Sequence, residues 1–381
     1  MSYNLVDPVK LTQQLVQCKS VTPLEGGALQ LLSDILTQAN FSCTRVDRNG
    51  IPNLFARWGT EGPVFGFNGH TDTVPVGDLD AWSVDPFGGE IKQEKLWGRG
   101  AADMKSGVAA FVAAAVSFVH ESPPKGSLII TITGDEEARA VDGTIAIFDW
   151  MEAQNQKMDV CIVGEPTCPE IMGEAIKIGR RGSLSVKITM LGVQGHSAYP
   201  ERYINPVEAM VHLGYQLTST KLDEGTDNFQ PSNLALSSIE TGNETSNIVP
   251  GRCTALLNIR FSDQHSSKSL LKWIRDTVIN VASDHKCEGK MELLSSAESF
   301  ITPKGDFTDL VANAVYKTIG IQPELSTSGG TSDARFIIHH CPVVEVGLVG
   351  KTIHQVDEHV EIQQIRDLKS IYVQCLKDYF G

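Results

Sequence analysis

The sequence contains no long basic run, because no stretch of Lys and Arg is longer than two residues. Its 32 Lys and Arg stand against 46 Asp and Glu, which gives a net charge of −14 at pH 7. A surface of that sign repels nucleic-acid phosphates and anionic lipid head groups. We therefore expect no nucleic-acid partner and no membrane partner, whereas cation binding is compatible with this acidity.

The sequence also lacks a hydrophobic segment long enough to span a bilayer. Its longest apolar run, 108–119, is broken by Ser117 and is shorter than the roughly 20 residues that a spanning helix needs. The first residues have neither the basic nor the apolar part of a secretory signal, and Asp7 followed by Pro8 predicts a helix start. We therefore expect a cytoplasmic protein in which 108–119 forms a buried helix.

Cysteines are scattered, with eight in 381 residues and no Cys-x-x-Cys pair. A disulfide scaffold or a zinc knuckle needs closely spaced cysteines, so we expect reduced thiols that serve in packing. The composition, 41% hydrophobic and 20% charged residues, is typical of an ordinary globular protein.

The pattern of helices and strands indicates two domains, as does a length beyond what one hydrophobic core usually supports. Residues 8–180 alternate between helical segments and short β-branched apolar runs, which is typical of an α/β fold. From 182 to 294 the order becomes β-α-β-β-α-β, a ferredoxin-like α+β unit, and the α/β pattern then resumes. We predict one domain of residues 1–181 and 295–381, with 182–294 inserted into it.

Polar residues follow the ends of several predicted strands of the first domain, where open α/β sheets bind ligands. Together with an acid from the Gly-rich segment 98–105, these residues are His70, Asp103, Glu136, Glu137, Glu165 and His354. Two imidazoles and three carboxylates are what a pair of Zn²⁺-class ions needs, if one carboxylate bridges the ions.

Each of these residues also has an ordinary structural interpretation. A single His or Asp after a strand is usually a cap or a solvated loop residue, and Glu136 with Glu137 could form a solvated acidic turn. Adjacent acids at a strand end repel each other, however, and without a nearby cation they would lower stability. Their combination at several strand ends favours a metal site.

Eight segments resemble the motifs of a known family. Four resemble the serial motifs of the co-catalytic zinc aminoacylase/carboxypeptidase family: 70–75, 98–105, 135–137 and 164–166. Four more resemble the branch of that family that desuccinylates diaminopimelate: 179–184, 194–200, 328–336 and 352–354. The resemblance runs nearly end to end. It implies a mixed-sheet, zinc-exopeptidase-like catalytic domain with an inserted dimerisation domain, and therefore a homodimer.

The resemblance also implies a reaction and a metal content. The reaction is hydrolysis of N-succinyl-LL-2,6-diaminopimelate to succinate and LL-2,6-diaminopimelate, in lysine and cell-wall biosynthesis. The metal content is two Zn²⁺ per subunit, with Co²⁺ able to substitute at one site. Asp103 would bridge the ions, His70 and Glu165 would complete one site, and Glu137 and His354 would complete the other.

Further roles follow from the same resemblance. Glu136 would be the general base, and Asp72 would orient His70, although an Asx-turn is its ordinary interpretation. His196, in the inserted domain, would cross the dimer interface and stabilise the oxyanion in the partner's active site, where an ordinary surface or core histidine is the alternative.

The implied dicarboxylate substrate needs cationic and amide donors. The residues in the matching stretches are Arg180, Ser183, Tyr199, Asn247, Arg260, Gly330 and Thr331. Asn247 and Tyr199 could equally be turn or packing residues. The chain departs from the family pattern at Ala138, at Gly350 and in the order Ser106-Gly107. No departure removes a ligand, but Gly350 removes a possible hydrogen bond to substrate.

Two rival functions remain open from the sequence. A sister deacylase, such as acetylornithine deacetylase or a dipeptidase, would share the metal site and differ around the acyl group. A metal-free binding protein of the same fold is the rival from another class, and the complete ligand set argues against it.

Overall fold

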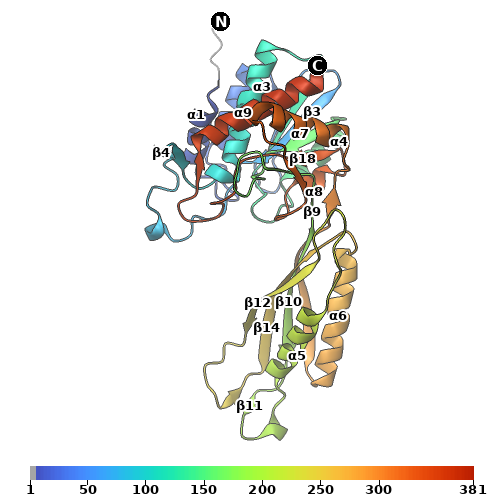
Figure 1. Ribbon diagram of the computed structural model, residues 1–381. Coiled ribbons are helices and arrows are strands. Elements are labelled where there is room, and N and C mark those ends of the chain that lie inside the picture. The colour runs from blue at the N-terminus through green and yellow to red at the C-terminus, as the bar shows by residue number, and fades with distance from the viewer. Residues whose placement is uncertain (1–5) are drawn as a thin grey trace. The chain divides into compact units, whose positions relative to one another are not determined.

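The computed structural model describes residues 6–381, which form two compact units (Figure 1). The first unit contains the chain up to Ile178, together with Thr302–Ser326 and Ser332–Gly381, and the second contains Gly179–Ile301 and Thr327–Thr331. The sequence-based boundaries, after 181 and after 294, differ from these by a few residues. The short segment Thr327–Thr331 was expected in the first domain and groups with the second unit. Each unit is described by itself.

A mixed eight-stranded sheet forms the centre of the first unit, with the strand order β1-β2-β6-β3-β7-β18-β8-β17. The middle strands β3 (Val64–His70), β6 (Ser127–Thr133) and β7 (Val160–Val163) run parallel and are buried throughout. The remaining strands are β1 (Ser42–Arg45), β2 (Leu54–Trp58), β8 (Ala175–Lys177), β17 (Glu324–Ser326) and β18 (Val343–Glu345). Because β2 is antiparallel to β6, the expected mixed sheet is confirmed.

Helices cover this sheet, and the most buried of them is α3 (Ser106–Glu121). Its many alanines allow close packing, and Phe111 stacks on Phe67 of β3 with ring centroids 4.1 Å apart. The other helices of the unit are α1 (Pro8–Gln17), α2 (Ala28–Gln38), α4 (Thr144–Ala153), α7 (Asp306–Ile319), α8 (Ala334–Ile337) and α9 (Ile362–Phe380). Asp7 caps α1 by accepting from the N–H groups of Val9 and Lys10, so the predicted helix start is confirmed.

One helical stretch, Ala101–Glu121, is long and apolar enough to cross a membrane by length and composition. Its most hydropathic window is 100% buried inside the structure. This burial confirms the expectation that 108–119 forms a buried helix.

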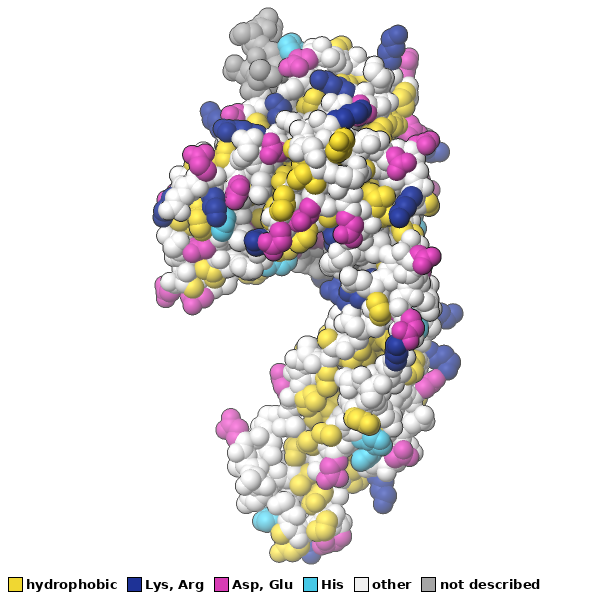
Figure 2. All heavy atoms as spheres, viewed as in Figure 1, with side chains coloured by type: hydrophobic (Ala, Val, Ile, Leu, Met, Phe, Trp, Pro, Cys, Tyr) yellow, Lys and Arg dark blue, Asp and Glu magenta, His cyan; other side chains and the backbone are white. Residues whose placement is uncertain are grey.

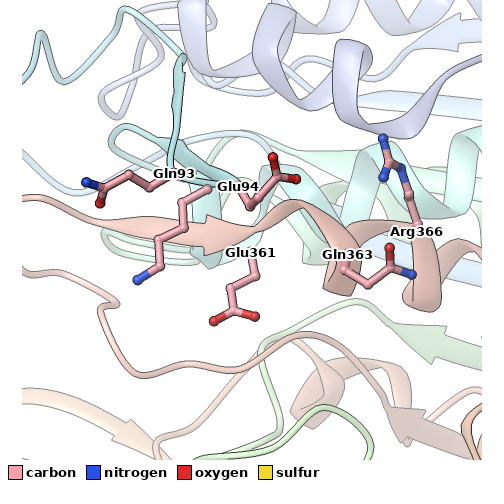
Figure 3. A pocket seen from close by; sticks show the side chains of 6 residues that line it. Gln93, Glu94, Glu361, Gln363 and Arg366 are labelled. Carbon is pink, nitrogen blue, oxygen red and sulfur yellow. The ribbon is translucent and has the colours of Figure 1, made fainter.

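A small antiparallel sheet of β4 (Glu90–Lys92), β5 (Lys95–Trp97) and β19 (His359–Glu361) lies beside the start of α9. A pocket of about 310 Å³ opens there. Its lining residues are Gln93, Glu94, Lys95, Glu361, Gln363 and Arg366. The labelled side chains point in different directions (Figure 3), so they do not converge on one ligand position.

The second unit has the elements β10 (Gly182–Leu191), α5 (Pro206–Ser219), β12 (Asn233–Glu240), β14 (Arg252–Phe261), α6 (Ser267–Asp284) and β15 (Glu288–Ala297). Their order is β-α-β-β-α-β, and the strands pair in the order β12-β14-β10-β15. Alternate residues of the strands, such as Val186 and Leu257, pack with Leu213 of α5 and Ile274 of α6 in one core. Four two-residue strands complete the unit: β9 (Gly179–Arg180), β11 (Gly195–His196), β13 (Ile248–Val249) and β16 (Phe300–Ile301).

Candidate metal centre

The parallel strands of the first unit bring most of the predicted ligands to one edge of the sheet. His70 is the last residue of β3, and Glu165 follows the end of β7 after one glycine. Glu136 and Glu137 come shortly after β6, which lies next to β3. The carboxyl ends of parallel strands point the same way, so residues far apart in the sequence meet here.

Asp103 lies between two imidazoles and presents one oxygen to each. It belongs to the irregular turn η2 (Ala101–Lys105), directly before α3. Its Oδ1 is 3.2 Å from Nε2 of His70, and its Oδ2 is 3.4 Å from Nε2 of His354. A carboxylate placed in this way can bridge two cations.

Two groups of possible metal ligands share Asp103. The first is His70, Asp103 and Glu165, and the second is Asp103, Glu137 and His354. Within each group the ligand atoms lie within 4.8 Å of one another. Three mixed N and O ligands per ion suit Zn²⁺-class metals and leave coordination positions for water or substrate. The donor set therefore fits the pair of ions that the sequence predicted.

The ring of His70 is oriented by the main chain of Asp72. Its Nδ1 lies 3.0 Å from the carbonyl oxygen of Asp72 and 3.6 Å from the carboxylate. A carbonyl only accepts, so Nδ1 carries a proton, and Nε2 points into the cluster toward Asp103. The sequence pointed to Asp72 as the orienting residue, and the structure shows that its backbone makes the direct hydrogen bond.

The carboxylate of Asp72 contacts the acidic pair instead. It accepts from the backbone N–H groups of Glu136 and Glu137, at 3.3 and 3.1 Å, and from the hydroxyl of Thr22 at 2.7 Å. One residue therefore fixes both a candidate ligand ring and the backbone of the two glutamates. Sequence reasoning missed Thr22, because nothing in its local pattern indicates a contact with residue 72.

The acidic cluster binds protons strongly in the absence of a cation. Burial raises the pKa of Glu136 and of Glu165 well above the usual carboxyl value. Burial lowers the pKa of His70, but the hydrogen bond to Asp103 and the charge of Glu165 outweigh it and raise that pKa well above 6.5. Hydrogen bonds to Asp103 and Glu137 raise the pKa of His354 to about 10. Protons thus neutralise charge that divalent cations would neutralise on binding.

Glu136 differs from the other acids of the cluster. It belongs to neither ligand group, and its Oε2 lies 4.0 Å from Nε2 of His70. Its side chain is only 13% exposed. The position suits a group that exchanges a proton beside the metal centre without binding the ions.

Three of the predicted substrate residues lie together in the second unit. Ser183 on β10 lies opposite Arg260 on β14. Arg180 and the next residue, Arg181, lie near enough for their charges to act on Arg260. Burial and the charges of Arg181 and Arg180 lower the pKa of Arg260. Buried nitrogens of Arg181 (Nε) and Arg260 (Nη1) have no hydrogen-bond partner in the structure. Such a group of guanidinium ions fits an anionic ligand.

The segment that contains Gly330 and Thr331 packs on this arginine group. Nη1 of Arg180 donates to the carbonyl of Ser328 at 3.1 Å. Gly329 has a φ of +105°, and a Cβ there would lie 2.3 Å from the same Arg180 nitrogen. Glycine is therefore required at 329, and Gly330 and Thr331 are held in the same unit as Arg180.

The remaining predicted residues of the second unit form a separate group around β11 and β13. His196 pairs with Ile248, the N–H of Ser197 donates to the carbonyl of Asn247 at 3.0 Å, and the rings of His196 and Tyr199 are 5.6 Å apart. The N–H of Ala198 donates to Nδ1 of His196 at 3.1 Å. The neutral ring therefore carries its proton on Nε2, which makes that atom a hydrogen-bond donor.

The comparison with protein families decides the identity of the fold. The model for Peptidase family M20/M25/M40 matches residues 66–378. The chain belongs to this family. A succinyl-diaminopimelate desuccinylase of Cereibacter sphaeroides is 61% identical over 377 residues, which cover 98% of this chain and 99% of that protein. One of Ruegeria pomeroyi is 58% identical over 378 residues, with coverages of 99% and 100%.

Solved structures of M20 enzymes share the fold at low identity. An M20 metallo-carboxypeptidase of Sulfolobus solfataricus matches with a TM-score of 0.82 and 17% identity, over 98% of this chain and 99% of that chain. A peptidase of Bacillus subtilis, described as a dinuclear metal-binding member of the M20 family, matches with a TM-score of 0.71 and 12% identity, over 98% of each chain. At these identities the likeness shows the M20 fold alone.

Proposed function

We propose that the chain is a metal-dependent amidohydrolase that converts N-succinyl-LL-2,6-diaminopimelate to succinate and LL-2,6-diaminopimelate. The observation that carries this proposal is the pair of ligand groups that share Asp103. The succinyl-diaminopimelate desuccinylases that are 58–61% identical over nearly the whole chain support this substrate over that of a sister deacylase.

The proposed cofactors are two Zn²⁺ ions per subunit, with Co²⁺ able to replace one. His70 and Glu165 would hold one ion, Glu137 and His354 the other, and Asp103 both. When bound, the ions supply Lewis acidity, which polarises the amide carbonyl and lowers the pKa of a nearby water.

Glu136 moves the proton in this reaction. It lies 4.0 Å from His70 and belongs to neither ligand group, so its carboxylate is available to accept the proton of the attacking water. It then returns that proton to the leaving amine, which must depart as a neutral group. Asp72 positions the backbone of Glu136 through the 3.3 Å hydrogen bond.

His196 stabilises the negative charge that develops on the carbonyl oxygen. Because its Nδ1 accepts from the N–H of Ala198, its Nε2–H is a donor. A donor placed at a developing oxyanion lowers the barrier of acyl transfer. In this proposal His196 acts in the active site of the other subunit of a homodimer.

The second unit offers a surface for that dimer. Strand β12 is an edge of the four-stranded sheet, so part of its backbone has no partner within the sheet. Val211 and Tyr215 on the neighbouring helix α5 are 60% and 71% exposed. Figure 2 shows hydrophobic side chains along the visible face of this unit. Pairing of two such edges would cover these groups and join the subunits.

The anionic groups of the substrate bind to the arginine group. Arg180 and Arg260 supply charge, and Ser183, Gly330 and Thr331 lie in the same unit as further donors. Tyr199 and Asn247 lie close to His196 at the paired strands β11 and β13. The enzyme works in the cytoplasm on this small anionic substrate, without a nucleic-acid or membrane partner.

The deciding experiment is turnover of two substrates by the zinc-loaded protein. We expect rapid release of succinate from N-succinyl-LL-2,6-diaminopimelate and little reaction with acetylornithine. Faster turnover of acetylornithine would replace the proposal by the sister deacetylase. A purified chain that takes up no zinc and turns over neither substrate would favour a binding protein of the M20 fold.

A further inference from the structure

A buried carboxylate outside the proposed ligand set lies behind Asp103. Glu358 is fully buried, and the hydrogen bonds that its carboxylate accepts come from one short segment, residues 99–103. Its Oε1 accepts from the N–H groups of Ala102 and Asp103, at 2.9 and 3.2 Å. Its Oε2 accepts from the N–H of Gly100 at 3.1 Å and from Nη1 of Arg99 at 2.7 Å.

Arg99 connects the same segment to the other ligand loop. Its Nη1 also donates to the carbonyl of Gln355 at 3.1 Å, and Gln355 directly follows His354. Its guanidinium lies over the ring of Trp82, 5.2 Å from the centroid. The ion pair between Arg99 and Glu358 therefore joins the chain around Asp103 to the chain after His354.

The surrounding backbone holds this pair in place. The N–H of Gly98 donates to the carbonyl of Glu358 at 2.8 Å, and the neighbouring strands β5 and β19 pair His359 with Trp97. Gly100 has a φ of +82°, and a Cβ there would lie 2.7 Å from Thr73. The segment from 98 to 103 can therefore wrap the carboxylate only with glycine at 100.

We propose that Glu358, together with Arg99, is a positioning pair that fixes the main chain of Asp103 in register with His354 and so sets the affinity of the metal centre. The proposal rests on the proposed metal centre of the preceding section. Asp103 and His354 are both ligands in the group with Glu137, so this ion depends on the pair through two ligands. The ion held by His70 and Glu165 depends on it through Asp103 alone.

The test is metal affinity, measured on folded protein. Metal-free wild type, Glu358→Gln and Arg99→Lys are titrated with Co²⁺, and the visible absorption of the bound ion is followed well below each melting temperature. In Glu358→Gln, the side-chain N–H₂ faces N–H donors of residues 99–103 and cannot accept their hydrogen bonds. In Arg99→Lys, the single ammonium group cannot reproduce the geometry with which arginine bonds to both Glu358 and Gln355. We expect one of the two Co²⁺ affinities to fall about 10–100-fold and the other to fall less.

The matched control is Asp223→Asn in the second unit. The side chain of Asp223 is 1% exposed and accepts from the N–H of Gly225 at 2.7 Å, the N–H of Ser232 at 2.9 Å and the hydroxyl of Ser262 at 2.9 Å. This variant should lower the melting temperature and leave both Co²⁺ affinities unchanged. It separates loss of stability from loss of ligand positioning.

Each outcome decides the inference. If Glu358→Gln does not fold, Arg99→Lys decides, because Glu358 then still accepts from the three backbone N–H groups. Folded variants that bind two Co²⁺ ions with wild-type affinity would overturn the positioning role alone. A wild-type chain that binds fewer than two ions would overturn the proposed metal centre and this inference with it.

Discussion

At the scale of single residues, the proposed function gives different roles to the two adjacent glutamates after β6. Glu137 lies with Oε1 3.1 Å from Nε2 of His354, in a ligand group, whereas Glu136 lies outside both groups. The backbone N–H groups of both residues donate to the carboxylate of Asp72, which holds the backbone of the pair in this arrangement. The division predicts opposite effects for the two substitutions.

Glu136→Gln should retain two zinc ions and lose turnover by about 10²–10⁴-fold, the usual contribution of a general base. The amide has nearly the same shape as the carboxylate but cannot accept the proton. Zinc content by elemental analysis and turnover under saturating substrate measure the two effects. Glu137→Gln is the matched comparison and should weaken the binding of one of the two zinc ions. Loss of zinc from Glu136→Gln would show that the two roles are reversed.

The stability of the metal-free protein should fall as the pH rises. The folded chain holds protons on His70 and His354 more tightly than the unfolded chain, whose histidines titrate near 6.5. Their stabilisation is fully present below pH 6.5 and is lost as the pH rises through the folded pKa, about 10 for His354. The raised pKa values of Glu136 and Glu165 act in the same direction.

The measurement for this pH dependence is the melting temperature of metal-free and zinc-loaded protein across that range. Zinc replaces the protons, so the melting temperature of the zinc-loaded protein should depend much less on pH. Zinc binding should also release protons. A melting temperature of the metal-free protein that rises with pH over this range would contradict the origin assigned to these pKa shifts.

At the scale of elements, helix α3 touches the chain that carries Glu165. A Cβ at Gly107 would lie 2.3 Å from the carbonyl oxygen of Gly164, which directly precedes Glu165. Gly107→Ala should therefore destabilise the fold by about 1–3 kcal/mol, although alanine is the better helix former. It should also weaken the binding of the zinc ion proposed at His70 and Glu165. Urea unfolding and zinc titration measure the two effects.

The control for this prediction is a glycine inside another helix. At Gly214 of α5 a Cβ would meet only the end of the Leu236 side chain, at 3.3 Å. Gly214→Ala should leave the stability equal or raise it by up to about 1 kcal/mol, by helix propensity alone. Equal effects at the two positions would argue against the close packing of α3 on the end of β7.

The elements could largely be predicted from the sequence, because apolar periodicity marks them. The order β-α-β-β-α-β expected between 182 and 294 and the buried helix expected at 108–119 both appear in the structure. Strand β8 and helix α4 were not predicted, since β8 has only three residues and α4 is apolar on several sides.

For the candidate site, the residue types could be predicted from the sequence, but some of the contacts that hold them could not. The candidate ligand types follow from polar residues at strand ends, and the structure brings these residues within 4.8 Å of one another in two groups. The contacts of Thr22 with Asp72 and of Glu358 with residues 99–103 were not foreseen. They join segments that are distant along the chain, and only the folded structure places them side by side.

At the scale of the whole molecule, the proposed chemistry is shared between two subunits. The ligand groups and Glu136 belong to the first unit, and His196 belongs to the second. The proposed two-fold dimer would use the edge strand β12 and the exposed residues Val211 and Tyr215 of α5. Tyr215→Glu at that surface should shift the protein toward monomers in sedimentation experiments and reduce turnover in proportion to the dimer lost.

Mixing two inactive variants tests whether His196 acts across the interface. Glu136→Ala lacks the base and His196→Ala lacks the oxyanion donor, so each homodimer should be nearly inactive. In a mixed dimer, one site combines the intact Glu136 of one chain with the intact His196 of the other. Random reassortment of equal amounts makes half of the dimers mixed, each with one complete site, so activity should approach about a quarter of wild type. Subunits that exchange without any recovery of activity would show that His196 acts within its own chain or only in folding.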